Sequence, residues 1–312
     1  MITKPMDVLE KYEIRKTKKQ KTEFQNAVVA YTERLGYTVC VEKGSLGSRN
    51  IVIGDTTKAK YLVTAHYDTC AWMPVPNFIT PCNFLVYLLW QILLTFGIFG
   101  IAFGLGLGAS VLFNAPGLDM GVFLIFLYGI LGLLIFGPAN RHTANDNTSG
   151  VVTVLEIMQS LPENLKDRVA FVLFDLEEAG LVGSASYQKN HKRDTNGQII
   201  LNLDCIGDGD EILFFPTKKL RKDAEKMNVI NLVQGKWGRK SIAVKQKNFA
   251  FYPSDQTAFP YGVGIAAFRR AKWIGLYCSR IHTHRDTVLE LTNVNVLRAA
   301  IISMIAGDMK EI

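Results

Sequence analysis

Seven histidine and acidic residues are spaced along the chain in a way that could bind metal ions and activate water. Most of them directly follow a stretch typical of a buried strand, and the others lie in polar loops: His66, Asp68, Asp146, Glu177, Glu178, Asp204 and His282. Imidazole and carboxylate groups together are the donors that zinc and similar divalent ions prefer. Five such ligands exceed the three that one catalytic zinc takes. A carboxylate bridging two ions about 3.5–4 Å apart would account for the surplus.

Each of these residues, taken singly, has a simpler interpretation. Asp146 could cap the helix expected at residues 151–161, and Asp204 could cap a turn. Glu177 and Glu178 could stabilise the positive end of the helix that follows them. A lone histidine at the end of a strand is more often a hydrogen-bonded core or surface residue than a ligand. The set as a whole, rather than any one member, favours a metal site.

The stretch at residues 169–183 contains the adjacent carboxylates of Glu177 and Glu178. It begins as an almost continuous apolar run, which predicts a strand buried on both faces of a mostly parallel sheet. Two adjacent carboxylates at the end of such a strand are costly to bury unless a positive charge lies between or beside them. A metal ion would supply that charge.

The elements that must position these side chains alternate between strands and helices along the chain. This order predicts a three-layer α/β domain with a largely parallel central sheet. We expect strands at 37–42, 50–53, 60–65, 169–175, 199–204, 211–215 and 264–268, and helices at 22–35, 151–161, 182–192, 218–232 and 293–309. Residues 1–21 are charged and are expected to be helical or frayed. Because chemistry in open α/β sheets lies at the carboxyl ends of the strands, the predicted ligands should converge there.

The composition limits the classes of partner. The 312 residues are 48% hydrophobic with a formal net charge of +7, and much of that charge lies in 11–21 and 218–247. Neither stretch interleaves aromatic and basic residues as a nucleic-acid groove would, so no nucleic-acid partner is expected. The positive charge instead indicates a cytoplasmic face next to a membrane. Five cysteines without regular spacing indicate no disulfide framework, and residues 1–25 contain no apolar secretory signal.

A long hydrophobic segment interrupts the globular pattern. Asp119 is the only charged residue between Phe84 and Phe136, and a turn signature around it divides the segment into two. We predict two transmembrane helices at about 84–113 and 119–137, within an insert at 77–140 that divides the domain formed by 1–76 and 141–312. Glycines four residues apart should let the helices approach closely, namely Gly100, Gly104 and Gly108. The alternatives are a buried core hairpin or a lid over the site.

Five ordered motifs resemble those of the co-catalytic zinc aminopeptidases, metallopeptidase family 28 of clan MH, which includes bacterial leucyl aminopeptidases and aminopeptidase Y. The motifs are His66-Tyr-Asp68, Asn145-Asp146-Asn-Thr-Ser-Gly150, Glu177-Glu-Ala-Gly-Leu-Val-Gly183, Leu203-Asp204 and Ile281-His-Thr-His-Arg-Asp-Thr287. Ser254-Asp255 and residues 260–268 are similar to a later segment of the family. The resemblance covers nearly all of the chain except residues 1–21 and the insert. It implies the three-layer zinc-exopeptidase fold and hydrolysis of N-terminal residues from peptides.

The resemblance also implies a role for each residue. His66 and Asp204 would hold one zinc, Glu178 and His282 would hold a second, and Asp146 would bridge them. Glu177 would be the general base rather than a ligand, and Asp68 would orient His66. His284, two residues after His282, is the alternative ligand. Some relatives have an oxyanion-stabilising tyrosine directly before the last ligand, and Ile281 stands there instead.

The position of the insert restricts its topology. It lies between His66 and Asp146, which must reach the same site, so the chain must cross the membrane an even number of times. Two spans satisfy this, and the lysines of the N-terminal part predict a catalytic domain on the cytoplasmic side of the cell membrane. Placed there, the cleft would favour hydrophobic or membrane-released peptides.

Three functions are consistent with these residues. The first is a membrane-anchored, di-zinc aminopeptidase acting on peptide substrates. The second is other zinc-dependent amide chemistry on the same scaffold, such as glutaminyl cyclisation, although relatives with that activity tend to use a single zinc. The third is a non-catalytic membrane binding protein, but relatives that serve as receptors have lost ligands or the base, and here all are present.

Overall fold

The computed structural model describes residues 1–115, 117–246 and 250–309. Within these ranges the strands form one mixed ten-stranded sheet in the order β1-β2-β4-β3-β5-β9-β6-β8-β7, with β10 paired to β9. The strands are β1 (Val39–Lys43), β2 (Arg49–Ile53), β3 (Tyr61–His66), β4 (Val169–Phe174), β5 (Ile199–Leu203), β6 (Glu211–Pro216), β7 (Gly235–Trp237), β8 (Lys240–Val244), β9 (Gly262–Ala271) and β10 (Gly275–Tyr277).

The centre of the sheet is parallel, as the alternation of strands and helices predicts. Strand β3 lies between β4 and β5 and is parallel to both, and β5 is parallel to β9. The antiparallel pairs lie toward the edges, where β2 runs against β4 and β6 runs against β9. The predicted α/β fold with a largely parallel central sheet is therefore confirmed.

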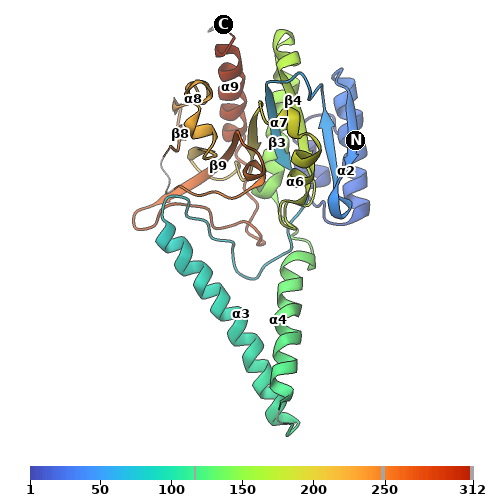
Figure 1. Cartoon of the computed structure of the whole chain (residues 1–312), viewed down its shortest axis with the longest axis vertical. Helices are drawn as coiled ribbons and strands as arrows, with labels where there is room; N and C mark the ends of the chain where they lie inside the picture. The colour runs from blue at the N-terminus through green and yellow to red at the C-terminus, as the bar shows by residue number, and fades with distance from the viewer. Residues whose placement is uncertain (116, 247–249, 310–312) are drawn as a thin grey trace.

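Helices cover both faces of this sheet and make three layers (Figure 1). The helices are α1 (Asp7–Tyr12), α2 (Lys18–Arg34), α3 (Phe84–Leu112), α4 (Leu118–Phe136), α5 (Gly150–Ser160), α6 (Val182–Asn190), α7 (Lys192–Thr195), α8 (Ala224–Asn231) and α9 (Leu291–Gly307). Buried residues of α1, α2, α5, α8 and α9 pack in the large core on one face. On the other face a smaller core contains Tyr187 of α6 and Phe259, which follows the 3-10 turn η5 (Asp255–Ala258).

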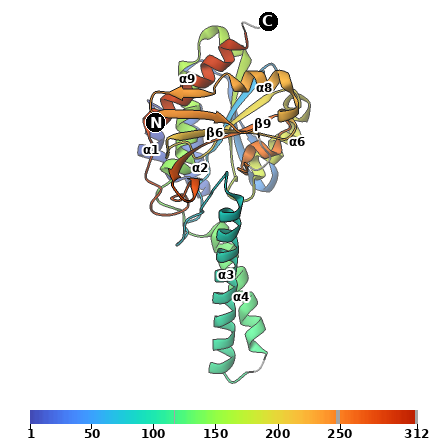
Figure 2. The same cartoon turned by 90° about the vertical axis from the view of Figure 1, so that its left-hand side faces the viewer.

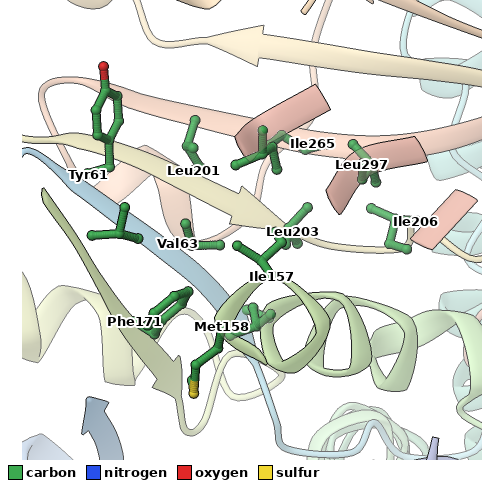
Figure 3. Close-up of a cluster of buried hydrophobic side chains, with 14 of the residues drawn as sticks. Tyr61, Val63, Ile157, Met158, Phe171, Leu201, Leu203, Ile206, Ile265 and Leu297 are labelled. Carbon is green, nitrogen blue, oxygen red and sulfur yellow. The ribbon is translucent and has the colours of Figure 1, made fainter. Parts of the chain in front are cut away.

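The register of the three central strands explains why both faces are apolar. Val63 pairs with Phe171 on one side and Leu201 on the other, and all three side chains belong to the core beneath α5 and α9 (Figure 3). The neighbouring residue Leu62 pairs with Ala170 and belongs to the opposite core. Because side chains alternate along a strand, a continuous apolar run supplies both layers at once.

The structure corrects one expectation from the sequence and decides between the alternatives of another. The helix expected at 218–232 is interrupted, because the side chain of Asp223 accepts a hydrogen bond from the Lys226 amide and caps a new helix. The result is a short turn, η4 (Leu220–Lys222), followed by α8. For the N-terminal residues, expected to be helical or frayed, the helical alternative holds, since α1 and the start of α2 lie there and Val8 of α1 is fully buried.

Helices α3 and α4 project away from the globular domain as a hairpin (Figures 1 and 2). Both are long and apolar enough to cross a membrane by length and composition. Only 11% and 6% of their most apolar windows are buried in the protein, so the hairpin is not a core element of the domain. The alternative of a buried core hairpin is therefore wrong, whereas the insert boundaries at 77 and 140 stay a prediction.

The two helices approach each other at a different glycine from those expected. A side chain at Gly100, Gly104 or Gly108 would meet nothing within 4 Å. At Gly106 a Cβ atom would lie 2.5 Å from the backbone oxygen of Asp119, so this glycine is the point of close contact. The sequence pattern identified the small residues but not the face of the helix that meets its partner.

Candidate active site and metal centre

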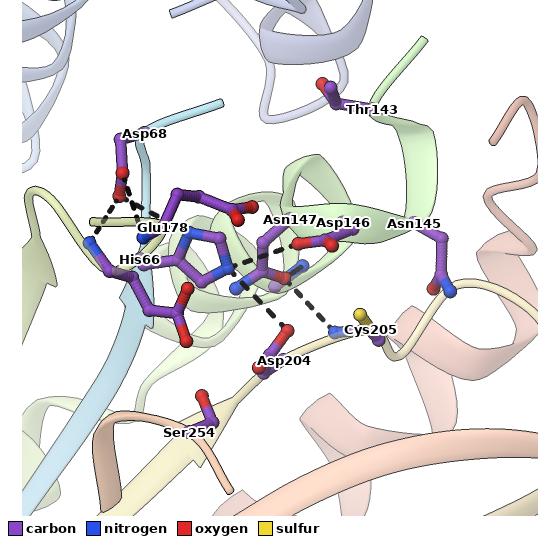
Figure 4. Close-up of polar contacts among 12 residues, drawn as sticks. His66, Asp68, Thr143, Asn145, Asp146, Asn147, Glu178, Asp204, Cys205 and Ser254 are labelled. Carbon is purple, nitrogen blue, oxygen red and sulfur yellow. Dashed lines mark hydrogen bonds and ion pairs between the residues drawn. The ribbon is translucent and has the colours of Figure 1, made fainter. Parts of the chain in front are cut away.

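The side chains expected to act together do lie together, at the carboxyl edge of the parallel strands (Figure 4). His66 is the last residue of β3, and Asp204 directly follows β5. Glu177 and Glu178 follow β4 after a short turn. Asp146 arrives from a wide helical turn, η2 (Ala144–Ser149), that precedes α5. The shared edge exists because parallel strands end on the same side of the sheet.

His66 lies between carboxylates on its two ring nitrogens. Its Nδ1 is 3.5 Å from Asp68 Oδ1, while its Nε2 is 3.3 Å from Asp146 Oδ1 and 3.7 Å from Asp204 Oδ1 (Figure 4). Asp68 is itself fixed, because its carboxylate accepts hydrogen bonds from the backbone amides of Glu177 and Glu178 at 3.0 and 3.2 Å. The Asp68 carboxylate therefore fixes the turn that carries the two glutamates and lies next to the imidazole of His66.

The second oxygen of Asp146 faces a different set of donors. Asp146 Oδ2 is 3.1 Å from His282 Nε2, and the same nitrogen is 3.5 Å from Glu178 Oε2. Two groups of potential ligands therefore share Asp146, one with His66 and Asp204 and the other with Glu178 and His282. A third group joins His66 to Glu177 and Glu178 and does not include Asp146. His284, the alternative ligand, is exposed and belongs to none of these groups.

The residues fit a metal centre on geometric grounds. Two ligand atoms that are each 2.0–2.1 Å from a tetrahedral ion lie about 3.3 Å apart. The four distances from His66 and His282 to their carboxylates range from 3.1 to 3.7 Å. Glu178 Oε1 and Asp204 Oδ1 are buried and have no hydrogen-bond partner, which in a folded protein calls for an ion or another donor.

Charge leads to the same conclusion. Burial lowers the pKa of His66, but Glu177 and the surrounding carboxylates outweigh it and raise this pKa well above its usual value. Burial, followed by the charge of Asp146, raises the pKa of Glu178 well above its usual value. Burial would raise the pKa of Asp146, but hydrogen bonds from His282 and His66 outweigh it and lower this pKa. Without a cation the cluster must therefore take up protons, whereas a divalent ion would let its carboxylates stay ionised.

Hydrogen bonds between loops hold the Asp146 segment in place. The carboxylate of Asp286 accepts from the backbone amides of Asn145 and Asp146 at 2.8 and 3.0 Å. The side chain of Asn145 accepts from the Gly207 amide at 2.6 Å, and that of Asn147 donates to the Leu203 carbonyl at 2.9 Å. These polar side chains connect the loops after β5 and before α9 to the loop that carries Asp146.

Three of the loops at the site also contain a non-glycine residue in the left-handed region. These are Leu176 before the two glutamates, Cys205 after Asp204, and His282 itself, with φ between 56° and 64°. Such conformations cost of order 1–3 kcal/mol each and persist only where surrounding contacts enforce them. The positions of the ligands are therefore set by the tertiary structure and not by local preference.

The site opens into a pocket of about 300 Å³. Asn77 and Ile79, which belong to the segment leading into α3, form part of its wall together with Tyr252. The Tyr252 hydroxyl donates to the carbonyl of Asp204 at 3.2 Å. A smaller cavity of about 80 Å³ adjoins it and also has Asn77 and Ile79 in its lining, with Phe84 and Tyr87 from the first turn of α3. The segment that leads into α3 therefore lines the pocket at the site, and the first turn of α3 lines the cavity beside it.

Sequence reasoning missed several residues of the site. Arg15 is fully buried and donates hydrogen bonds to the carbonyls of Tyr12 and Tyr67 and to the hydroxyl of Thr148, all at 2.5–3.1 Å. Asp255 is fully buried, neither of its carboxylate oxygens has a hydrogen-bond partner, and burial raises its pKa to about 7. The one feature of the sequence that could have indicated the burial of Arg15 is that it is an arginine among the lysines of residues 11–21, and this feature is weak.

Comparison with known proteins supports this description. The model of peptidase family M28 matches residues 130–304. Solved structures with the same fold include the LapA aminopeptidase of Legionella pneumophila (14% identity, 98% of this chain and 69% of that chain, TM-score 0.56). A glutaminyl cyclase of Porphyromonas gingivalis (14%, 97% and 96%, 0.56) and a Zn-dependent exopeptidase of Parabacteroides distasonis (13%, 94% and 91%, 0.55) are also similar. No curated protein sequence is similar enough to match.

The central sheet with helices on both faces, and the histidine–carboxylate cluster at the carboxyl edge of this sheet, define a zinc-exopeptidase fold. The family match covers more than half of the chain, so the chain belongs to peptidase family M28 and is a zinc metallopeptidase, a hydrolase.

Proposed function

We propose that this protein is a membrane-anchored aminopeptidase that works with two zinc ions. The observation that carries the proposal is the division of the Asp146 carboxylate, whose two oxygens face two separate groups of ligands. His66 and Asp204 would hold one zinc, and Glu178 and His282 the other. When bound, such ions polarise the scissile carbonyl and lower the pKa of water that binds them.

The protein groups would then carry out the remaining steps. Glu177 lines the pocket and lies within reach of His66 and Glu178. The family resemblance makes it the base rather than a ligand, so its carboxylate would accept the proton of the attacking water. The same carboxylate would return that proton to the leaving amine. Asp68, 3.5 Å from His66 Nδ1, would hold the imidazole in the orientation that leaves Nε2 for the metal.

The acidic character of the pocket favours a substrate with a free amino terminus. Among the described residues, no lysine or arginine forms an ion pair with Asp146, Glu177, Glu178 or Asp204. The site therefore offers carboxylate oxygens to a positively charged α-amine, and this attraction would restrict cleavage to the first residue of a peptide.

The membrane anchor is supported by what surrounds the base of the α3–α4 hairpin. Lys16 donates from its Nζ to the carbonyl of Ile135 near the end of α4 at 2.7 Å. Near the start of α3, the side chain of Asn83 donates to the carbonyl of Ile274 at 3.2 Å, next to exposed Lys272 and Trp273 at the tip of the β9–β10 hairpin. Tryptophan and basic residues gather where protein meets lipid headgroups on the cytoplasmic side, which supports two spans with the catalytic domain facing the cytoplasm.

The pocket wall gives a reason for a preference among peptides. The cavity next to the site is lined by Ile79, Phe84, Tyr87 and Phe251, and two of these lie on the first turn of the anchoring helix. We expect hydrophobic peptides, released at or near the membrane, to be the better substrates. Equal turnover of polar and apolar peptides by the protein in lipid would contradict this preference.

The test uses the full chain purified in detergent, a panel of aminoacyl amide reporters and their N-acetylated counterparts. Wild type should bind two zinc ions and cleave only the free-amine reporters. Glu177→Gln should keep its zinc and lose about 10²–10⁴-fold in kcat, because a general base contributes that much. Glu163→Gln, the same change at an exposed glutamate that pairs with Lys166, should behave as wild type.

Glutaminyl cyclisation is the second candidate, since a solved glutaminyl cyclase is as similar in fold as the aminopeptidase. Formation of pyroglutamate from glutaminyl peptides, without hydrolysis of the reporters, would replace the aminopeptidase proposal. Binding of one zinc rather than two would favour the same replacement. Absence of bound metal would contradict both and favour a non-catalytic membrane protein.

A further inference from the structure

A buried thiol lies against the second group of ligands and has no part in the function proposed above. Cys70 follows β3 by four residues, is fully buried, and stands where the chain leaves the domain for α3. The potential ligand atoms of Cys70, Asp146, Glu178 and His282 all lie within 4.8 Å of one another. We propose that Cys70 is the fourth ligand of the second zinc; this proposal rests on the two-zinc centre of the proposed function.

The neighbouring glutamate points to a shared ligand rather than to simple packing of the thiol. The Glu178 side chain is 90% buried, and its Oε1 has no hydrogen-bond partner. Cys70 Sγ is likewise without a hydrogen bond among the described residues. Zinc–sulfur and zinc–oxygen bonds of about 2.3 and 2.0 Å place these atoms roughly 3.6 Å apart around a tetrahedral ion. The 4.8 Å within which all four candidate atoms lie is compatible with a small shift of the sulfur toward this separation.

The loop that carries Cys70 is held firmly enough to present a ligand. The Cys70 carbonyl accepts a hydrogen bond from the Asn140 amide at 3.1 Å, which ties the start of the insert to its end. The preceding residue, Thr69, is bonded at both its amide and its hydroxyl to the backbone of Arg15. Residues that bind a metal are held in position by hydrogen bonds to other parts of the protein, and these contacts would hold Cys70 in that way.

Ligation by Cys70 would make the two halves of the centre chemically different. The group of His66, Asp146 and Asp204 has three protein donors and leaves one position of a tetrahedral ion open. The group of Asp146, Glu178 and His282 would gain the thiolate as a fourth protein donor, and water would reach that ion only as a fifth ligand. A thiolate selects zinc over magnesium or manganese. The second ion should therefore be held more tightly and more selectively than the first.

The experiment reads the metal–sulfur bond directly and does not depend on activity. The full chain in detergent is loaded with Co²⁺ and its near-ultraviolet absorption is recorded, and X-ray absorption is measured on the zinc form. Wild type should show a sulfur-to-cobalt charge-transfer band and a zinc–sulfur distance of about 2.3 Å. Cys70→Ser should lose both signals and bind the second ion at least about 100-fold more weakly, since loss of a mere supporting partner already costs 10–100-fold.

Cys205→Ser is the matched control, because Cys205 is also buried and directly follows the potential ligand Asp204 but belongs to none of the ligand groups. It should keep the sulfur band. Wild-type protein with two bound cobalt ions and no sulfur band would overturn the proposal even if Cys70→Ser fails to fold, as would a band that survives in a folded Cys70→Ser protein. A sulfur band in protein that cleaves no aminoacyl amide would keep Cys70 as a ligand and refute the aminopeptidase function instead.

Discussion

The carboxyl edge of the sheet and the α3–α4 hairpin depart from ordinary protein packing in opposite ways. At the sheet edge, charged groups are inside the protein, with His66, Asp146 and Asp204 each less than a tenth exposed. In the hairpin, apolar groups are outside, with Phe96 at 73% and Ile125 at 71% exposure. A soluble domain places these two kinds of residue the other way round.

The difference teaches that each region lacks a different component. A cluster of buried carboxylates with unpartnered oxygens lacks a cation, and its donor types favour zinc. The two exposed apolar helices fit an apolar solvent, since their lengths of 29 and 19 residues, about 44 and 28 Å, compare with a bilayer core of roughly 30 Å. The function that we propose supplies both components, metal at one end of the structure and lipid at the other.

The largest effect should come from removing the residue that both metal groups share. We expect Asp146→Asn to release most of the bound zinc and to reduce kcat/KM by about 10⁴-fold or more, above the loss from a missing general base. Metal analysis and rates on aminoacyl amides would measure this. Asp308→Asn is the matched control, since Asp308 is a buried carboxylate paired with Lys60 and Arg168 at the far end of β3 and β4. A variant of Asp146 that retains two zinc ions would break the comparison.

Charges introduced into the hairpin should separate lipid from water as its surroundings. In a bilayer, Phe96→Lys and Ile125→Lys should each cost about 2.5–3.5 kcal/mol of insertion free energy, so the double variant should leave the membrane fraction. At positions exposed to water the same changes would lie within about 0.5 kcal/mol and leave the distribution unchanged. Fractionation of cells expressing each variant measures the outcome. Trp273→Lys tests the region expected to contact the lipid headgroups. It should reduce the membrane-bound fraction less than the hairpin variants do, because the membrane interface tolerates charge.

Arg15 should provide the smallest effect, because it is a buried charge whose partners all come from the protein. Burial lowers its pKa only to about 10, so the guanidinium stays charged at neutral pH. Arg15→Met leaves the carbonyls of Tyr12 and Tyr67 without their donor and should destabilise the domain by about 3 kcal/mol. Denaturant unfolding in detergent would measure this, with Arg141→Met at an exposed site as control. An unchanged unfolding midpoint for Arg15→Met would contradict the prediction, because it would show that the hydrogen bonds of Arg15 do not stabilise the domain.

Local sequence patterns were sufficient for the fold and for much of the site. The apolar run before Glu177 predicts β4, and the uncharged segment around Asp119 predicts two apolar helices. Residue type alone suggests histidine and carboxylate as ligands. Sequence patterns did not identify the face of α3 that contacts α4, where Gly106 lies. They also did not predict that a charged residue, Arg15, is buried.

The sequence by itself determined the fold class, because periodicity predicts strand and helix, and its donor types favoured a divalent metal. The class of protein followed from ordered motifs that resemble those of a known family. The tertiary structure alone decided which atoms meet. It turned the two oxygens of Asp146 toward different groups and brought Cys70 and Ile79 to the site, whereas the sequence motif already favoured His282 over His284. The physical reason is that these placements depend on contacts between loops more than 100 residues apart, such as Asp286 with Asp146. Those contacts hold Leu176, Cys205 and His282 in backbone conformations that no local preference selects.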